Sequence, residues 1–285
     1  MKQRKNKEII KSVIFHIVLV IGAIIFSLPF VWMIGTSLKT DLQIEDVSSI
    51  SRMLIPQPVQ WSNYYKALTY ISFFRYLWNT VYVTLMSIIG VTISCSLVAY
   101  SFARLRWPGR DATFLILLST MMLPAQVTMI PIFLIFTKLG WVNTLKPLWV
   151  PSFFGSAFYI FLLRQFFLTI PTDLEDAAKI DGCSYFTTFF RIMVPLIRPA
   201  IATVVIFQFM GAWNDFLNPL IYIHDKDLMT LSLGIQSYFT SAITYGAEWS
   251  NLMAASTMMT LPVVILFFLA QKHFIQGITL TGIKG

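Results

Sequence analysis

Residues 171–182 of the chain read PTDLEDAAKIDG, an acidic stretch inside a strongly hydrophobic protein. The stretch holds four of the 13 acidic side chains, although 56% of the 285 residues are hydrophobic and only 12% are charged. Thr172 and Glu175 have the spacing of a capping box, and acidic residues suit the first turn of a helix. Gly182 supplies the left-handed conformation that commonly ends a helix. The sequence therefore predicts a short helix over 173–181, with Thr172 as its N-cap.

A second, aromatic-rich helix is predicted directly after this glycine, from Ser184 to Met193. The two helices would form an elbow on the cytoplasmic side of the membrane. A helix as short as the first is marginal in isolation, so its strong local signals suggest that it keeps its shape away from the rest of the protein. Ala177 and Ala178 would let another protein's backbone approach closely. A well-capped connector between two spans explains the same helix signals, and these signals alone favour the connector.

Long stretches without charged side chains lie on both sides of the elbow, and a helix needs about 20 apolar residues to cross a bilayer. These stretches are 12–38, 76–103, 112–137, 147–163, 199–214 and 249–271, and the fifth continues past Asp215 to Ile223. The mean hydropathy of +0.71 excludes an ordinary soluble domain. The first stretch is too long for a signal peptide and no cleavage site follows it. We therefore predict an all-α polytopic membrane protein with six transmembrane helices.

The orientation follows from the positive-inside rule. With the N-terminus inside, the cytoplasmic segments hold 14 Lys and Arg residues and the outer segments hold 7. Both termini are therefore predicted to be cytoplasmic. The net charge of +8 reflects this topology and gives no separate support for nucleic-acid binding.

The chain is expected to divide into three parts: residues 1–74 with the first span and a long outer loop, a core over 75–272, and a cytoplasmic tail over 273–285. A short amphipathic helix is predicted near 61–68, either resting at the membrane interface or docking an outer partner. Small residues in the second span, namely Ser87, Gly90, Ser94 and Ser96, predict a close packing face. Pro124 and Pro131 predict a break in the third span, serving a water-lined path or a purely structural kink.

Residues for catalysis or nucleotide binding are not found in the sequence. The nearest approach to a phosphate-binding loop is GITLTGIKG at 277–285, where Ile283 separates Gly282 from Lys284 and no Ser or Thr follows. The three histidines have no metal-ligand spacing. We therefore expect no enzyme activity, no cofactor and no metal.

Asp215 is the one carboxylate near the membrane interior, and with Asn214 and Asn218 it forms a polar cluster before Pro219. Ionisable groups at membrane depth usually face a cavity or a partner. The cluster is therefore a candidate lining of a translocation path. A hydrated carboxylate at a helix end explains it equally well.

The longer spacing around the acidic helix resembles the EAA loop of ABC importer permeases. Asp176 to Pro195 reads D-A-A-x3-G-x9-I-x2-P against the family's E-A-A-x3-G-x9-I-x-L-P, with Asp176 in place of Glu and Val194 in place of Leu. Three further stretches are also similar to the MalG-type sugar permeases: NYYKAL at 63–68, WNDFLNPLIYI at 213–223 and GITLTGIKG at 277–285. The resemblance implies a type I ABC importer transmembrane fold in a bacterial plasma membrane, with the coupling loop at 171–195.

The resemblance also implies the partners and the residues that meet them. The acidic helix would be a coupling helix that contacts an ATPase through Glu175, Asp176, Ala177, Ala178, Lys179, Asp181 and Gly182. The permease would pair with a second, related permease, with two ATPase subunits that bind the ATP, and with an extracellular solute-binding protein. Its substrate would be a sugar, expected to be an oligosaccharide.

Two other functions fit the sequence less well. An ion-coupled secondary transporter would need paired ionisable groups or broken helices in matching halves of the chain, and Asp215 has no such counterpart. If the chain were a regulatory or structural membrane protein, its EAA-like spacing would be a coincidence.

Overall fold

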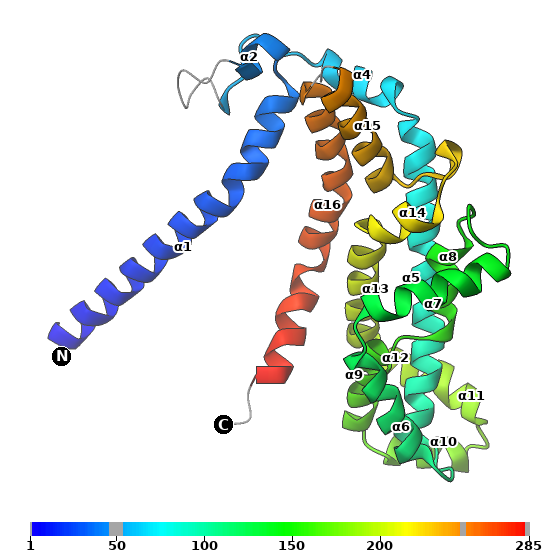
Figure 1. Cartoon of the computed structure of the whole chain (residues 1–285). Helices are drawn as coiled ribbons and strands as arrows, with labels where there is room; N and C mark the ends of the chain where they lie inside the picture. Colours follow the sequence, from blue (N-terminus) through cyan, green and yellow to red (C-terminus); the bar gives the residue numbers. More distant parts are fainter. Residues whose placement is uncertain (1, 46–53, 246–248, 283–285) are drawn as a thin grey trace. The chain divides into compact units, whose positions relative to one another are not determined.

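The computed structural model describes residues 2–45, 54–245 and 249–282, and every regular element within these ranges is a helix (Figure 1). The helices before the acidic segment are α1 (Lys2–Ser37), α2 (Asp41–Glu45), α4 (Ser62–Tyr70), α5 (Phe73–Arg104), α6 (Arg110–Ser119), η1 (Thr120–Met122), α7 (Ala125–Lys138), α8 (Lys146–Trp149), η2 (Val150–Phe154) and α9 (Ala157–Thr169). Those from it onwards are α10 (Asp173–Ile180), α11 (Tyr185–Thr188), η3 (Phe189–Met193), α12 (Val194–Leu196), α13 (Arg198–Trp213), α14 (Leu217–Tyr222), η4 (Lys226–Leu228), α15 (Leu231–Tyr245) and α16 (Trp249–Gly282).

Four helical segments of the described chain are long and apolar enough to cross a membrane: 10–37, 73–104, 146–169 and 249–271. Two further helix pairs qualify when each is counted as one bent span. The first joins 110–122 to 125–138 at 101°, and the second joins 185–196 to 198–213 at 79°. The predicted number of six spans is reached with these two broken helices. The orientation of the termini stays a prediction.

Proline explains the first break. Pro124 precedes α7 with φ −60° and ψ 136°, and Leu123 before it is also extended. Proline has no N–H to donate and disfavours helical geometry in the preceding residue, so the helix stops there. Pro131 is instead accommodated inside α7. The predicted third span therefore breaks at Pro124.

The described residues form two units, one of residues up to 73 together with 235–261, and one of residues 74–234 together with those from 262 onwards. In the first unit, α4 lies close to the position at which the sequence predicts a short helix, residues 61–68. The buried Asn63 Nδ2 donates to the carbonyls of Ser37 and Lys39, at 3.0 and 2.7 Å. Ala67 packs against Ala254 and Ala255. Helix α4 is therefore held by contacts to the end of α1 and to α16 within this unit.

The core of the second unit lies between α5, α9, α13 and the segment 189–197. Cys95, Leu163, Phe167, Met193 and Ala200 have no exposed surface there. In Figure 1, α10 and α11 lie at one end of this unit, whereas α8 and α14 lie towards the other. The acidic helix thus belongs to the end of the unit where α5 finishes and α6 begins.

Three of the four small residues predicted to form a close packing face do so, and the fourth, Ser96, donates its Oγ to the carbonyl of Thr92 in its own helix at 2.6 Å. Ser87 Oγ donates to the carbonyl of Leu148 at 3.3 Å, and Ser94 Oγ donates to that of Ser152 at 3.1 Å. Gly90 lies against the ring of Phe153. The partner of this face is the segment 146–156, which holds α8 and η2 and whose backbone carbonyls accept from the two serines.

Gly90→Leu is expected to destabilise the folded permease. A Cβ at this position would lie 2.5 Å from Phe153 Cδ2, and overpacking of this kind costs roughly 1–3 kcal/mol. Thermal unfolding of the purified protein in detergent would measure the loss. Gly22→Leu in α1 is the matched control, because a Cβ at Gly22 has no neighbour within 4 Å. Equal unfolding temperatures for the two variants would show that α5 does not need this close contact.

Candidate functional site

Helix α10 confirms the short helix that the acidic sequence predicts. Gly182 has φ +76°, its N–H donates to the carbonyl of Lys179 at 3.0 Å, and the N–H of Cys183 donates to the carbonyl of Ala178 at 2.9 Å. This pair of bonds is the Schellman termination, which glycine favours because it adopts positive φ without a Cβ clash. The helix therefore stops sharply where the sequence places its glycine.

The predicted capping box is wrong. Thr172 has helical angles, φ −66° and ψ −27°, and its side chain makes no capping bond. Its backbone carbonyl accepts from the N–H groups of Glu175 and Asp176, at 2.9 and 3.1 Å. The side chain of Glu175 is engaged elsewhere, so it cannot return to the helix start. A tertiary contact has replaced the local one.

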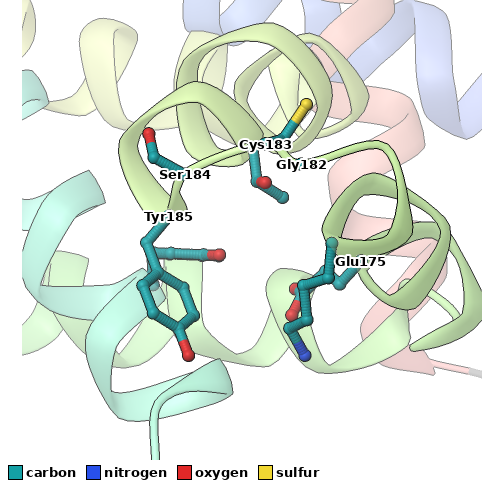
Figure 2. Close-up of a pocket in the computed structure, with 8 residues that line it drawn as sticks. Glu175, Gly182, Cys183, Ser184 and Tyr185 are labelled. Carbon is teal, nitrogen blue, oxygen red and sulfur yellow. The ribbon is translucent and has the colours of Figure 1, made fainter.

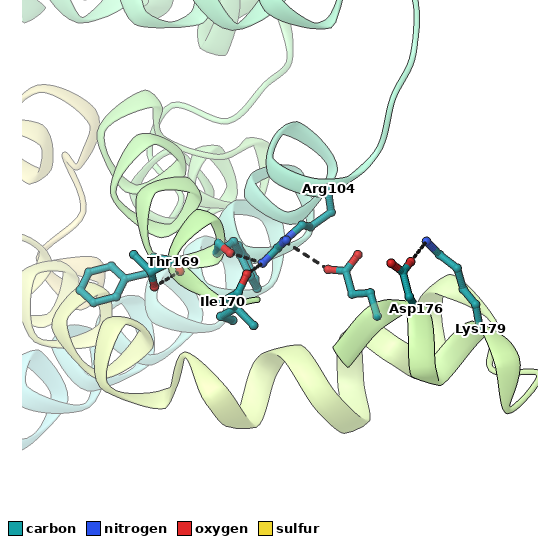
Figure 3. A network of polar contacts seen from close by, with 8 residues as sticks. Arg104, Thr169, Ile170, Asp176 and Lys179 are labelled. Carbon is teal, nitrogen blue, oxygen red and sulfur yellow. Dashed lines mark hydrogen bonds and ion pairs between the residues drawn. The ribbon is translucent and has the colours of Figure 1, made fainter. Parts of the chain in front are cut away.

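That tertiary contact is a buried ion pair between Glu175 and Arg104, the last residue of α5. Arg104 Nε lies 3.2 Å from Glu175 Oε1, and the two side chains are 6% and 9% exposed (Figure 3). Arg104 Nη2 also donates to the backbone carbonyls of Phe167 and Ile170, where α9 ends. Burial raises the pKa of Glu175 and outweighs the opposing effect of the Arg104 charge.

The seven predicted coupling residues divide into two groups. The side chains of Glu175 and Ala178 are buried against their own chain. The other five are exposed: Asp176, Ala177, Lys179, Asp181 and Gly182. Lys179 Nζ pairs with Asp176 Oδ1 at 3.1 Å, and this hydrogen bond raises the pKa of Lys179. Helix α10 therefore has an anchored face and a free face within this chain.

The second half of the elbow differs from a simple helix. Ser184 caps α11, because its Oγ accepts from the N–H of Thr187 at 3.2 Å. The segment η3 is a π-helix, and it turns Phe189 and Met193 into the core. A cavity of about 340 Å³ lies between α10 and α11 (Figure 2), and its lining residues are Tyr100, Glu175, Lys179, Gly182, Cys183, Ser184, Tyr185 and Thr188.

Sequence reasoning missed the roles of Arg104 and Ser184. Ser184 followed by Thr187 has the spacing of an N-cap, so its role was readable from local signals. Arg104 stands at the end of a charge-free stretch, where its charge also fits the positive-inside rule. Its partners lie 63 to 71 residues away in the sequence, so no local pattern indicates them.

A second and larger cavity, of about 750 Å³, lies among α7, α8, η2, α13 and α14. Its wall is mainly apolar, with Gln126, Gln208, Asp215 and Asn218 among the polar residues. Of the predicted polar cluster, Asp215 and Asn218 line this cavity. Asn214 does not, and its Nδ2 donates to the carbonyl of Met210 at 2.9 Å.

Asp215 also has a local structural role. Its two carboxylate oxygens accept from the backbone N–H and the Nδ2 of Asn218, at 3.2 and 2.8 Å. Ser232 Oγ donates to its backbone carbonyl at 2.6 Å. The carboxylate thus binds the first turn of α14 while it also lines the cavity. Its place in a translocation path stays a prediction. Among the described residues, no group of three His, Cys, Asp or Glu is placed to hold a metal ion.

Comparison with known proteins gives this geometry its context. Residues 90–280 match the family model of binding-protein-dependent transport system inner membrane components, which covers more than half of the chain and includes α10. The chain belongs to this family. It is therefore a multi-pass membrane protein and an inner-membrane component of a transport system.

Relatives of known function support the assignment along most of the chain. The arabinooligosaccharides transport system permease protein AraQ of Halalkalibacterium halodurans is 36% identical over 207 residues, which is 73% of each chain. The trehalose/maltose transport system permease protein MalG of Thermococcus litoralis is 31% identical over 98% of this chain and 99% of its own.

The fold is also similar to a solved structure. A chain of a bacterial ABC transporter involved in the import of the acidic polysaccharide alginate has a TM-score of 0.82, at 23% identity. The match covers 93% of this chain and 96% of that one. The fold expected from the sequence, that of an ABC importer permease, is thereby confirmed.

Proposed function

We propose that this family member is one permease subunit of an ABC importer that moves a sugar, expected to be an oligosaccharide, into the cell. The observation that carries the proposal is the match over residues 90–280, which includes the short acidic helix α10. Five of the predicted contact residues, in α10 and directly after it, are exposed. The sequence has no phosphate-binding loop, so ATP that drives transport would be bound by a partner. The chain itself would bind no ATP and catalyse no reaction.

The proposed assembly contains a second, related permease, two ATPase subunits and an extracellular solute-binding protein. Helix α10 would be the coupling helix, and it would contact the ATPase through Asp176, Ala177 and Lys179 together with Asp181 and Gly182 directly after it. Glu175 and Ala178 would support this contact from the buried side, because their side chains pack against their own chain.

Transport would proceed by alternating access. ATP would close the ATPase dimer, α10 would carry that motion into the third to fifth spans, and the path would open outward to accept the sugar. Such coupling needs an element with two positions that the nucleotide biases. The 750 Å³ cavity, with Asp215 and Asn218 in its wall, is the candidate section of that path within this subunit.

Uptake into proteoliposomes tests the proposal. The vesicles hold the chain with its partner permease, its ATPase and its binding protein. They should take up labelled arabinotriose or maltose only when ATP is present on the side of the membrane that carries the ATPase. Replacing the phosphate-binding lysine of the ATPase should lower uptake by about 100-fold or more, since that lysine holds the β- and γ-phosphates. Ionophores that collapse ion gradients should leave uptake unchanged.

The alternative is an ion-coupled secondary transporter that works without an ATPase. It predicts the reverse pattern, in which ionophores abolish uptake and ATP is not needed. That result would refute the importer assignment.

A further inference from the structure

Arg104 connects three segments of the second unit that are far apart in the sequence. It is the last residue of α5, its Nη2 donates to two carbonyls at the end of α9, and its Nε faces the carboxylate of Glu175 in α10. Figure 3 shows the guanidinium between the end of α9 and the start of α10. Arginine suits this position because its planar group presents several N–H donors in fixed directions.

Helix α10 has few other anchors. It has eight residues, and among them only Glu175 and Ala178 are buried in the described structure. On the side of α11 it faces the 340 Å³ cavity rather than a packed neighbour (Figure 2). A helix of this length gains little stability from its own hydrogen bonds. The ion pair with Arg104 is therefore a large part of what fixes its position.

The electrostatics of this contact make the two side chains depend on each other. Both are at least nine-tenths buried, so neither charge is compensated by water. Arg104 also meets the carbonyl end of α9, where a positive charge is favourable. Loss of the arginine would leave a buried carboxylate without its counter-charge and two backbone carbonyls without this donor. Loss of both side chains would leave no unpaired charge.

We propose that Arg104 is a positioning residue that ties α10 to the inner ends of α5 and α9, so that a displacement of α10 is transmitted to these two helices. The inference rests on the proposed function of α10 as the coupling helix. It assigns the transmission of this displacement to one set of contacts, which is the Arg104–Glu175 ion pair together with the hydrogen bonds from Arg104 to the carbonyls of Phe167 and Ile170. This role requires no contact of the arginine with ATP or sugar.

Hydrogen exchange of the full chain in lipid nanodiscs tests the positioning directly and needs no partner. Arg104→Gln should raise amide exchange over 174–182 by about tenfold or more, while amides in α13 keep their protection. Arg104→Lys should give an intermediate rise, because one ammonium cannot reach all three acceptors. The double variant Arg104→Met with Glu175→Leu should recover much of the protection. Arg191→Gln is the matched control, since Arg191 is exposed on the same elbow.

The assembled importer in proteoliposomes supplies the functional measurement. In Arg104→Gln complexes that retain their ATPase, the ATP hydrolysed per arabinotriose or maltose imported should rise by about threefold or more, because a loosely held α10 transmits less of its motion. In the double variant, the ratio of ATP hydrolysed to sugar imported should fall part of the way back to the wild-type value. A purely structural role would lower the amount of assembled complex and leave this ratio unchanged.

The outcomes separate this inference from the function on which it rests. Wild-type protection over 174–182 in Arg104→Gln, or a wild-type ratio of ATP to sugar, would overturn the positioning role. If Arg104→Gln does not assemble, the comparison is made between Glu175→Gln and the double variant, and equal loss of protection in both would overturn it. A wild-type complex without ATP-driven uptake would refute the proposed function, and the exchange data would still decide whether Arg104 holds α10.

Discussion

Ala177→Trp is expected to lower ATP-driven uptake by about 100-fold or more, while the permease still inserts into the membrane. Ala177 lies on the exposed face of α10, so a larger side chain there replaces no packed contact within the chain. If α10 enters a cleft of the ATPase, the added side chain blocks close approach of the two backbones. Uptake and co-purification of the ATPase would be measured on the same membranes.

Ala112→Trp provides the matched control for this substitution. Ala112 is also an exposed alanine in a short helix of the same unit, close to the N-terminus of α6. It lies outside the predicted contact residues, so its variant should keep both the ATPase and most of the uptake. Wild-type uptake in Ala177→Trp with the ATPase bound would contradict the assignment of α10 as the coupling helix.

Gly182→Val is expected to lower uptake by about tenfold or more through the backbone. Gly182 has φ +76°, and a left-handed conformation costs a residue with a Cβ roughly 1–2 kcal/mol, with a larger penalty for a β-branched side chain. A Cβ there has no neighbour within 4 Å, so the effect is strain in the Schellman turn rather than a clash. Gly182→Asn should retain most of the uptake, because asparagine tolerates this conformation. Uptake rates of the two variants would be compared at equal amounts of inserted permease.

Gly109→Val separates backbone strain from position. Gly109 has φ +83° and equally open surroundings, but it precedes α6 instead of ending α10. Both valine variants carry the same local strain, so a selective loss in Gly182→Val would assign the effect to the elbow. Equal losses in the two variants would show that general destabilisation is the cause, and the elbow would have no special role.

Several features of this fold were predictable because they depend on local sequence. Charge-free stretches reveal membrane spans because the hydrocarbon core penalises charge over a fixed length. Helix α10 follows from the acidic residues at its start and from Gly182 at its end. The close packing at Gly90 follows from small residues at helical spacing. In each case the physical cause acts on residues that are neighbours in the chain or along one helix.

Other features could not be predicted in this way. Thr172 and Glu175 carry the local pattern of a capping box, but Glu175 turns to Arg104 instead. The broken third span is only partly readable, because Pro124 and Pro131 offer the same signal and the helix stops at one and continues through the other. A local signal sets what a residue can do, and its surroundings select among these possibilities.

The sequence by itself determined the all-α membrane fold, the existence and length of α10, and the glycine that ends it. Tertiary structure alone decided which faces of α10 are buried and free, and that Arg104 joins it to α5 and α9. It also decided that Asp215 and Asn218 face a cavity whereas Asn214 does not. The physical reason is that membrane insertion and helix termination are local free energies, whereas the desolvation of an ion pair depends on contacts between residues some 70 positions apart.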